Sequence, residues 1–446
     1  MNDSARTILK YMDQEYPCFE DRISRGIEEN RKGSCTLHLK TADGAPVSKA
    51  SIRFCHKRHE YHFGCNGFML GQFEEDEKNA AYEEEFAKLF NLAVVPFYWS
   101  DLEPEDGKPR FDRNSPPIYR RPPIDSVLDY CEAKRIFPKG HPLIWHEFVP
   151  DWIPTTKSEI EQRWEKRIRE IAKRYGERIG IWDVCNEALQ WNHVSMALMP
   201  DEHVEKAFRM AEKYFPTNTR LLYNEGPWAS WNSFGSDYTP LYLLARHLKQ
   251  AGLPIRGLGL QYHLFYKDLV VLAERSRQMI NPVYLFAHMD QYAKLGLPLN
   301  VSEITIPAHQ DFGDGERFQA YLTERLYRIW FSHAATNGIV WWNMVDGTAA
   351  QAGGFNNDQG ENRWRGGVLN FDMSHKPAFT VLDRLINEEW STDGSLTYED
   401  GRRNGFRGFY GEYELAIDTD SGEVVRTVTL SKESRNEFTI TLETPR

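Results

Sequence analysis

The sequence lacks the features that mark membrane, secreted and nucleic-acid-binding proteins. Its 446 residues contain no apolar run long enough to span a membrane, and Met1 to Thr7 hold no run resembling a secretory signal. No dense cluster of Lys and Arg accompanies the net charge of −11, and no low-complexity tract is present. We therefore expect a globular, cytoplasmic protein with neither a membrane nor a nucleic-acid partner.

Cysteine is scarce and scattered. None of the six residues forms the Cys-x-x-Cys spacing of a zinc or redox site. This scatter fits reduced, mostly buried thiols better than a disulfide framework, so we expect no metal ion and no other cofactor. The six residues are Cys18, Cys35, Cys55, Cys65, Cys131 and Cys185.

Aromatic residues, in contrast, are abundant. They make up 13% of the chain and include 13 Trp. A large aromatic core accounts for most of them, and exposed Trp faces would offer platforms for sugar rings.

From Tyr61 onward, strand-like runs alternate with helix-like segments. Repeated βα units predict a (β/α)8 barrel. An open doubly wound sheet is the alternative, but no Gly-x-Gly-x-x-Gly follows the first strand. The eight strand candidates are Tyr61–Cys65, Leu92–Pro96, Phe137–Ile144, Ile181–Asn186, Arg220–Tyr223, Gly257–Gln261, Leu299–Glu303 and Gly338–Asn343.

The two ends of the chain differ from this pattern. Residues 1–32 predict two helices separated at Pro17, and residues 33–57 predict two strands joined by a turn at Asp43-Gly44. Residues 391–446 predict further short strands. Because an isolated hairpin is marginal in water, we expect both sets to form one small β-sandwich beside a barrel of residues 58–390.

Two carboxylates fall at strand ends within the predicted barrel. Glu187 follows the fourth strand and Glu303 ends the seventh. Barrel enzymes keep their chemistry at the C-terminal ends of their strands, and glycoside hydrolysis requires a pair of carboxyl groups. The pair predicts a glycosidase, although a lone strand-end Glu is more often a surface or capping residue.

Other polar residues gather at the same strand ends. Gln261 and His263 follow the sixth strand, and Asn186 precedes Glu187. His141 and His146 are an odd number of residues apart, so on one strand they would face opposite ways. They would not share a metal ion, and we expect His146 to form hydrogen bonds at the strand end.

Several motifs in order resemble glycoside hydrolase family 10, the endo-β-1,4-xylanase family. Trp182 to Glu187 resembles its acid/base motif, and Gly140 to His146 resembles its third-strand motif. The similarity continues through the motifs at Gly257–His263, Val301–Ile306 and Trp342–Asp346.

The resemblance implies a role for each site residue. Glu187 would be the general acid/base and Glu303 the nucleophile of a retaining mechanism. Asn186 would bond the sugar 2-hydroxyl, and His263 would contact the nucleophile. The same sugar site would be lined by His146, Gln261, Trp342, Trp99 and Tyr98.

Two departures from the family pattern affect the substrate. The second strand lacks the family's Glu-Asn-x-Met-Lys-Trp segment and keeps only Trp99, after the run Val94-Val95-Pro96-Phe97-Tyr98. Thr305 stands where the family has Asp, two residues after the nucleophile.

We therefore predict a retaining β-glycosidase for a small or decorated glycoside, with an apolar group against Val94, Val95, Phe97 and Tyr98. An endo-β-1,4-xylanase proper, or a non-catalytic sugar-binding relative, is the alternative. Retention of both carboxylates with Asn186 and His263 favours an enzyme.

Overall fold

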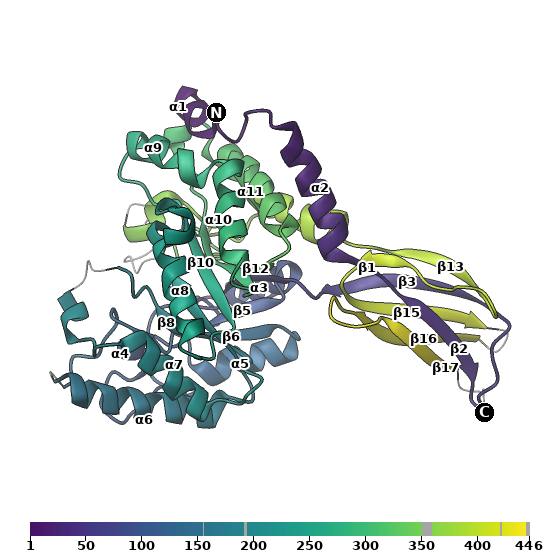
Figure 1. Ribbon diagram of the computed structural model, residues 1–446, viewed down its shortest axis with the longest axis horizontal. Coiled ribbons are helices and arrows are strands. Elements are labelled where there is room, and N and C mark those ends of the chain that lie inside the picture. The colour runs from purple at the N-terminus through teal and green to yellow at the C-terminus, as the bar shows by residue number, and fades with distance from the viewer. Residues whose placement is uncertain (155, 191–193, 350–358, 420–421, 443–446) are drawn as a thin grey trace. The chain divides into compact units, whose positions relative to one another are not determined.

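The computed structural model describes residues 1–154, 156–190, 194–349, 359–419 and 422–442 (Figure 1). The chain divides into two compact units, which are described separately. The first unit contains Met1–Glu15, Phe63–Trp330 and Ala335–Val381. The second contains Tyr16–His62, Phe331–Ala334 and Leu382–Arg446.

The first unit is a closed parallel barrel, which confirms the predicted fold. Its sheet runs in the order β6-β5-β4-β12-β11-β10-β9-β8-β7, and β6 also pairs with β8, so β6 and β7 together occupy the third position. The strands are β4 (His62–Asn66), β5 (Leu92–Pro96), β6 (Phe137–His141), β7 (Ile144–Trp145), β8 (Ile181–Asn186), β9 (Arg220–Glu225), β10 (Gly257–His263), β11 (Leu299–Thr305) and β12 (Thr336–Trp341).

Helices surround this sheet (Figure 1). The helix before the last strand ends at Ser332, because the chain is already in β12 from Thr336. The helices of this unit are α1 (Asp3–Leu9), α3 (Asp76–Leu89), α4 (Trp99–Leu102), α5 (Ile124–Ala133), α6 (Lys157–Tyr175), α7 (His203–Tyr214), α8 (Pro240–Gln250), α9 (Leu269–Met279), α10 (Pro282–Ala293), α11 (Gly315–Ser332) and α12 (Pro377–Asp383).

The barrel strands are buried on both faces. Every residue of β5 and of β10 is buried, because one face fills the barrel and the other packs under helices. The outer packing is tight where β6 meets β8: a Cβ on Gly140 would lie 2.2 Å from the Trp182 ring. Functional side chains must therefore come from the strand ends, where the barrel opens.

The second unit confirms a β-sandwich built from both ends of the chain. β3 (Lys49–His59) lies between β13 (Gly394–Glu399) and β15 (Gly411–Thr419), and β16 (Gly422–Leu430) continues that sheet. β2 (Thr36–Thr41) pairs in parallel with β17 (Glu437–Leu442). β1 (Lys32–Ser34) pairs with β14 (Arg407–Phe409), and α2 (Pro17–Arg31) precedes β1.

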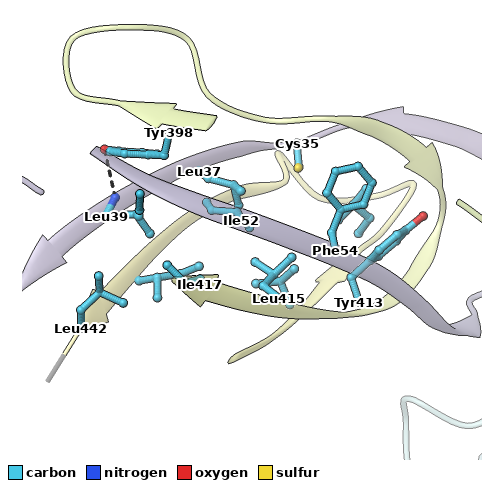
Figure 2. Close-up of a cluster of buried hydrophobic side chains, with 14 residues drawn as sticks. Cys35, Leu37, Leu39, Ile52, Phe54, Tyr398, Tyr413, Leu415, Ile417 and Leu442 are labelled. Atoms are coloured by element: carbon cyan, nitrogen blue, oxygen red, sulfur yellow. Dashed lines mark hydrogen bonds between the residues drawn. The ribbon is translucent and has the colours of Figure 1, made fainter. Parts of the chain in front are cut away.

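The sandwich core joins the two sets of strands, as Figure 2 shows. Leu37, Leu39, Ile52 and Phe54 pack in one cluster with Leu415 and other residues of the C-terminal strands. The Leu39 amide also donates to the Tyr398 hydroxyl at 3.1 Å. The turn at Asp43-Gly44 is exposed, as expected.

No helix among the described residues is long and apolar enough to cross a membrane. All six cysteines are free.

Candidate active site

A cleft of about 600 Å³ opens at the C-terminal ends of the barrel strands. It is lined by seven of the nine predicted site residues: Tyr98, Asn186, Glu187, Gln261, His263, Glu303 and Trp342. Residues that the sequence analysis did not assign to the site complete the lining: His141, Trp145, Glu147, Gln190, Pro227, Trp228, Asn232, Phe265, Glu274, Arg275, Gln278 and Glu361.

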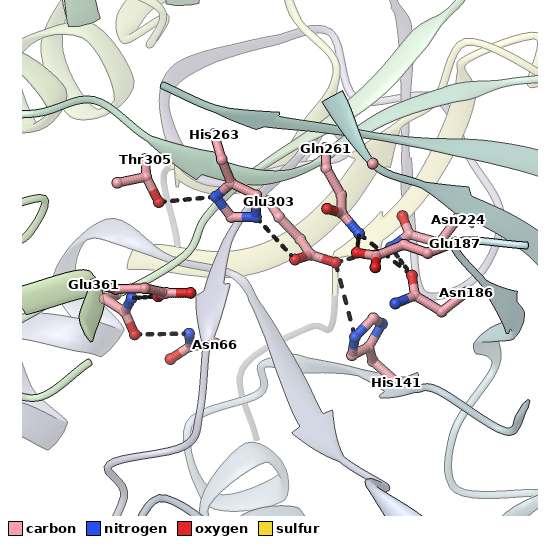
Figure 3. Close-up of polar contacts among 12 residues, drawn as sticks. Asn66, His141, Asn186, Glu187, Asn224, Gln261, His263, Glu303, Thr305 and Glu361 are labelled. Atoms are coloured by element: carbon pink, nitrogen blue, oxygen red, sulfur yellow. Dashed lines mark hydrogen bonds and ion pairs between the residues drawn. The ribbon is translucent and has the colours of Figure 1, made fainter. Parts of the chain in front are cut away.

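The register of the sheet brings the polar side chains together. Gln261 lies beside Glu303 and His263 beside Thr305 where β10 pairs with β11. Asn186 lies beside Asn224 where β8 pairs with β9. Four neighbouring strands therefore contribute to one polar cluster (Figure 3).

Glu303 is buried and bonded on both carboxylate oxygens. Its Oε1 accepts from Asn224 Nδ2 at 2.8 Å, and its Oε2 lies 3.2 Å from His263 Nε2. The other ring nitrogen of His263 lies 2.9 Å from the Thr305 hydroxyl, so the ring is fixed at both nitrogens. Contacts on both oxygens fix the orientation of the Glu303 carboxyl group, which suits a nucleophile.

Asn224 was not predicted, yet it connects the predicted nucleophile with Asn186. Its amide nitrogen donates to Glu303 Oε1 and to Asn186 Oδ1, each at 2.8 Å. Gly259 on β10 makes room for it, because a Cβ there would lie 1.9 Å from Asn224 Oδ1. The polar end of β9 was the available signal, since the predicted strand stopped at Tyr223.

Glu187 has a different environment from Glu303. Its Oε1 accepts one hydrogen bond, from Gln261 Nε2 at 2.7 Å. Burial raises the pKa of Glu187 well above its usual range, and the charge on Glu303 raises that pKa further. The side chain is thus held in the protonated form, which suits a general acid.

The backbone at Glu187 has an unusual conformation. Its φ of 55° lies in the left-handed region, which costs a residue other than glycine about 1–2 kcal/mol. The Glu187 amide donates to Asn224 O at 2.9 Å, and Gln190 N donates to Glu187 O at 3.2 Å. Strained backbone held by its surroundings is common where a side chain must be aimed into a site.

His141, rather than His146, lies beside the predicted nucleophile. Its Nε2 is 3.8 Å from Glu303 Oε1, and its Nδ1 is 2.8 Å from Asp183 Oδ2. Asp183 in turn forms an ion pair with Lys139 at 2.9 Å, inside the barrel. The four side chains form a continuous chain of contacts that ends on Glu303.

His146 and Trp99 are not among the residues that line the described cleft, so their expected contacts with the sugar stay predictions. Trp145 lines the cleft, whereas His146, just past the end of β7, is buried. Trp99 starts α4, where its Nε1 donates to Glu103 Oε2 at 2.9 Å and its ring meets the edge of Trp152. Trp99 therefore has a packing role in this structure.

The expected apolar wall is represented in the cleft lining by one of its four residues, Tyr98. Val94, Val95 and Phe97 are buried and do not line the cleft, and Phe97 packs against Trp182 with ring centroids 4.6 Å apart. Only Tyr98, just past the end of β5, lines it. Both faces of a barrel strand are covered along most of its length, so a substrate is contacted by residues near or beyond the strand's C-terminal end.

Comparison with known proteins places this barrel in a family. The family model for glycosyl hydrolase family 10 matches residues 69–383. The chain belongs to glycosyl hydrolase family 10. It is a xylanase-like glycoside hydrolase, and the matched range covers most of the first unit.

The curated relatives of this family 10 protein are distant. It is 23% identical over 322 residues to endo-1,4-beta-xylanase B of Thermotoga neapolitana, a match covering 69% of this chain and 84% of that one. It is 28% identical over 291 residues to a beta-1,4-xylanase of Dictyoglomus thermophilum, covering 59% of this chain and 74% of that one.

Solved structures show the same fold. Xylanase 10B from Thermotoga maritima superposes with a TM-score of 0.59 at 23% identity, covering 74% of this chain and 96% of that one. Xylanase 10B from Thermotoga petrophila, solved in complex with xylobiose, has a TM-score of 0.57 at 21% identity and covers 74% and 95%.

Proposed function

We propose that the protein hydrolyses β-glycosidic bonds with retention, using Glu303 as nucleophile and Glu187 as general acid/base. The observation that carries the proposal is the contrast between the two carboxyl groups. Glu303 is contacted on both carboxyl oxygens by Asn224 and His263, whereas burial and the charge of Glu303 raise the pKa of Glu187. An oriented carboxylate beside a carboxyl group with a raised pKa is the equipment of a double displacement.

In the first half of the reaction, Glu303 attacks the anomeric carbon while Glu187 gives its proton to the leaving oxygen. In the second half, Glu187 takes a proton from water, which releases the sugar from Glu303. Asn186, held by Asn224, would bond the sugar 2-hydroxyl. His263 and Trp342, whose rings meet edge to face at 5.7 Å, would bound the sugar on one side.

We propose a short or decorated glycoside, not polymeric xylan, as the main substrate. The end of β5 offers the cleft Tyr98 and none of the polar groups with which family xylanases hold the next sugar. Arg121 lies 4.0 Å over the Tyr98 ring and pairs with Asp101 at 2.8 Å, which keeps that wall in place. A xylan chain would therefore bind at this wall without the hydrogen bonds that those polar groups form in family xylanases.

An endo-β-1,4-xylanase is the second candidate, favoured by the names of the relatives. Turnover of xylan compared with that of short xylosides, glucosides and aryl glycosides separates the two. Cleavage of xylan at about 10⁴ M⁻¹s⁻¹ or more would favour the xylanase.

Azide rescue tests the catalytic assignment. Glu187→Ala should lower kcat about 10²–10⁴-fold for a substrate with a poor leaving group, and azide should restore part of the rate on an activated one. Glu274→Ala is the matched control, since Glu274 also lines the cleft but is exposed on α9. Equal behaviour of the two variants would refute the assignment. A non-catalytic sugar-binding protein would bind the same glycosides without turnover.

A further inference from the structure

Glu225 is a buried carboxylate next to the active site that the proposed reaction does not use. It is the last residue of β9 and is fully buried. A buried carboxylate is costly unless its oxygens are well bonded. The contacts of Glu225 therefore indicate what this residue does.

The carboxylate oxygens of Glu225 accept hydrogen bonds from two backbone amides and one hydroxyl group. Leu189 N donates to its Oε2 at 3.1 Å and Gly226 N to its Oε1 at 2.8 Å. The Tyr223 hydroxyl also bonds Oε2, while the same hydroxyl oxygen accepts from Ala188 N at 3.1 Å. The hydroxyl proton must then point to Glu225. Burial raises the pKa of Glu225, and these donors act against that rise.

These bonds secure the turn that carries Glu187. Three consecutive amides of that turn are held by β9: Glu187 N by Asn224 O, Ala188 N by the Tyr223 hydroxyl, and Leu189 N by Glu225. Glu187 itself has the left-handed φ of 55°. The Leu189 amide therefore bonds the Glu225 carboxylate directly, and the Ala188 amide is linked to it through the Tyr223 hydroxyl.

We propose that Glu225 is a positioning residue that holds the left-handed turn at residues 187–189 and so directs the Glu187 carboxyl group at the leaving oxygen. This inference rests on the proposed function, since it takes Glu187 as the acid. Glu225 acts through the turn and does not touch the substrate.

The charge of Glu225 also supports the role of Glu187 as the acid. It contributes to the raised pKa of Glu187, after burial and after the charge of Glu303. The other groups that face Glu187 are Gln261 of β10 and Glu147. The titratable groups that face Glu225 are Tyr223 on its own strand, Cys185 of β8 and Tyr292 of α10.

Glu225→Gln tests the proposal. The amide keeps the shape of the side chain, but in either orientation its NH2 group faces a donor that the carboxylate accepted from: the Gly226 amide, or the Leu189 amide and the Tyr223 hydroxyl. The cluster that holds the turn therefore loses at least one hydrogen bond. The rate on a glycoside with a poor leaving group should fall about 10-fold more than the rate on a dinitrophenyl glycoside, which needs little acid assistance. With one negative charge removed, the high-pH limb of kcat/KM should move to lower pH.

Two further variants separate geometry from charge and from stability. Tyr223→Phe removes the acceptor for Ala188 N but keeps the Glu225 charge. It should reproduce the leaving-group effect without the pH shift, and it serves as the test if Glu225→Gln does not fold. Glu103→Gln is the structural control, since the buried Glu103 accepts from Trp99 Nε1 and Gly107 N, each at 2.9 Å, away from the catalytic turn. It should lower stability and leave the leaving-group dependence unchanged.

Equal loss on both classes of leaving group, with an unmoved pH profile, would make Glu225 merely structural and overturn the proposal. Glu187→Ala, measured on the same glycosides, distinguishes a failure of the proposed function from a failure of the role proposed for Glu225. If that variant shows no leaving-group dependence, the proposed function fails. If Glu187→Ala shows this leaving-group dependence and neither Glu225→Gln nor Tyr223→Phe shows it, only the role of Glu225 fails.

Discussion

Asp183→Asn should destabilise the barrel strongly, because it removes the charge on which two other side chains depend. Asp183 Oδ2 lies 2.9 Å from Lys139 Nζ and 2.8 Å from His141 Nδ1. The side chains of Lys139 and Asp183 are 2% and 0% exposed, so water cannot replace the lost partner. Burial alone would raise the pKa of Asp183, but the charge of Lys139 and the bond from His141 outweigh it and lower that pKa.

The size of the stability loss follows from the ammonium group of Lys139, which Asp183→Asn leaves buried without its partner. At 2.9 Å and an effective dielectric constant of about 20, the lost attraction has an upper bound of about 6 kcal/mol. Measured losses on breaking one side of a buried ion pair are about 3–5 kcal/mol. At about 2 °C per kcal/mol for a large domain, the melting temperature of the barrel should fall by roughly 6–10 °C.

Calorimetry of Asp183→Asn and of the double variant Lys139→Met/Asp183→Asn provides the assay. The double variant should recover part of the loss, since it leaves no charge buried without a partner. The ionised Asp183 has a lowered pKa, so its contribution is present above about pH 4 and is lost as the pH falls further. The difference between wild type and Asp183→Asn should shrink accordingly in acid. A fall of under about 2 °C at neutral pH, or a double variant no better than the single one, would refute the reasoning.

Three further results are expected. Activity should be lost as the pH rises through the raised pKa of Glu187. A Glu303→Gln variant should lose turnover about 10⁴-fold or more. The same variant should lower the pKa of Glu187, because it removes the charge of Glu303, and a titration followed by NMR measures this change. Leu415→Ala, in the sandwich core, should cost about 2–5 kcal/mol, measured as a lower melting temperature of the second unit, and an unchanged value would mean that the core is not shared as described. Trp99→Phe should lower stability through the lost bond to Glu103 and leave KM nearly unchanged, whereas a large rise in KM would restore Trp99 to the sugar site.

The strands of the barrel could be predicted because each is a short apolar run between helical segments. Leu92–Pro96 and Ile181–Asn186 match the structure residue for residue. At β9, β10 and β11 the strands continue two residues past their predicted ends, to Glu225, His263 and Thr305. Those last residues are polar because they form hydrogen bonds at the end of the barrel: His263 with Thr305, and Glu225 with the Leu189 amide. Polar residues in a single sequence resemble the start of a loop.

The histidines show where local reasoning fails. The opposite-face argument assumed one continuous strand from Phe137 to Ile144 and beyond, but β6 ends at His141 and a separate strand, β7, starts at Ile144. His141 is therefore at a strand end of its own, beside Glu303. Sequence spacing cannot reveal a break that Pro142 and Leu143 make within an apolar run.

The hydrogen bonds around the turn at Glu187 could not be predicted at all. Tyr223 and Glu225 reach Ala188 and Leu189 across 35 and 36 residues, through the pairing of β8 with β9. Such contacts depend on the register between strands, which no pattern within one strand determines. The cleft residues of α9 could not be predicted either, because nothing within residues 269–279 shows that this helix borders the cleft.

Trapping the covalent intermediate tests the central claim most directly. A 2-deoxy-2-fluoro-β-xyloside with a good leaving group should inactivate the enzyme, and peptide mapping by mass spectrometry should find the sugar on Glu303. The product released from an ordinary β-xyloside should keep the β configuration when followed by NMR. A label on another residue, or an α product released without any covalent adduct, would contradict the assignment of Glu303 as nucleophile.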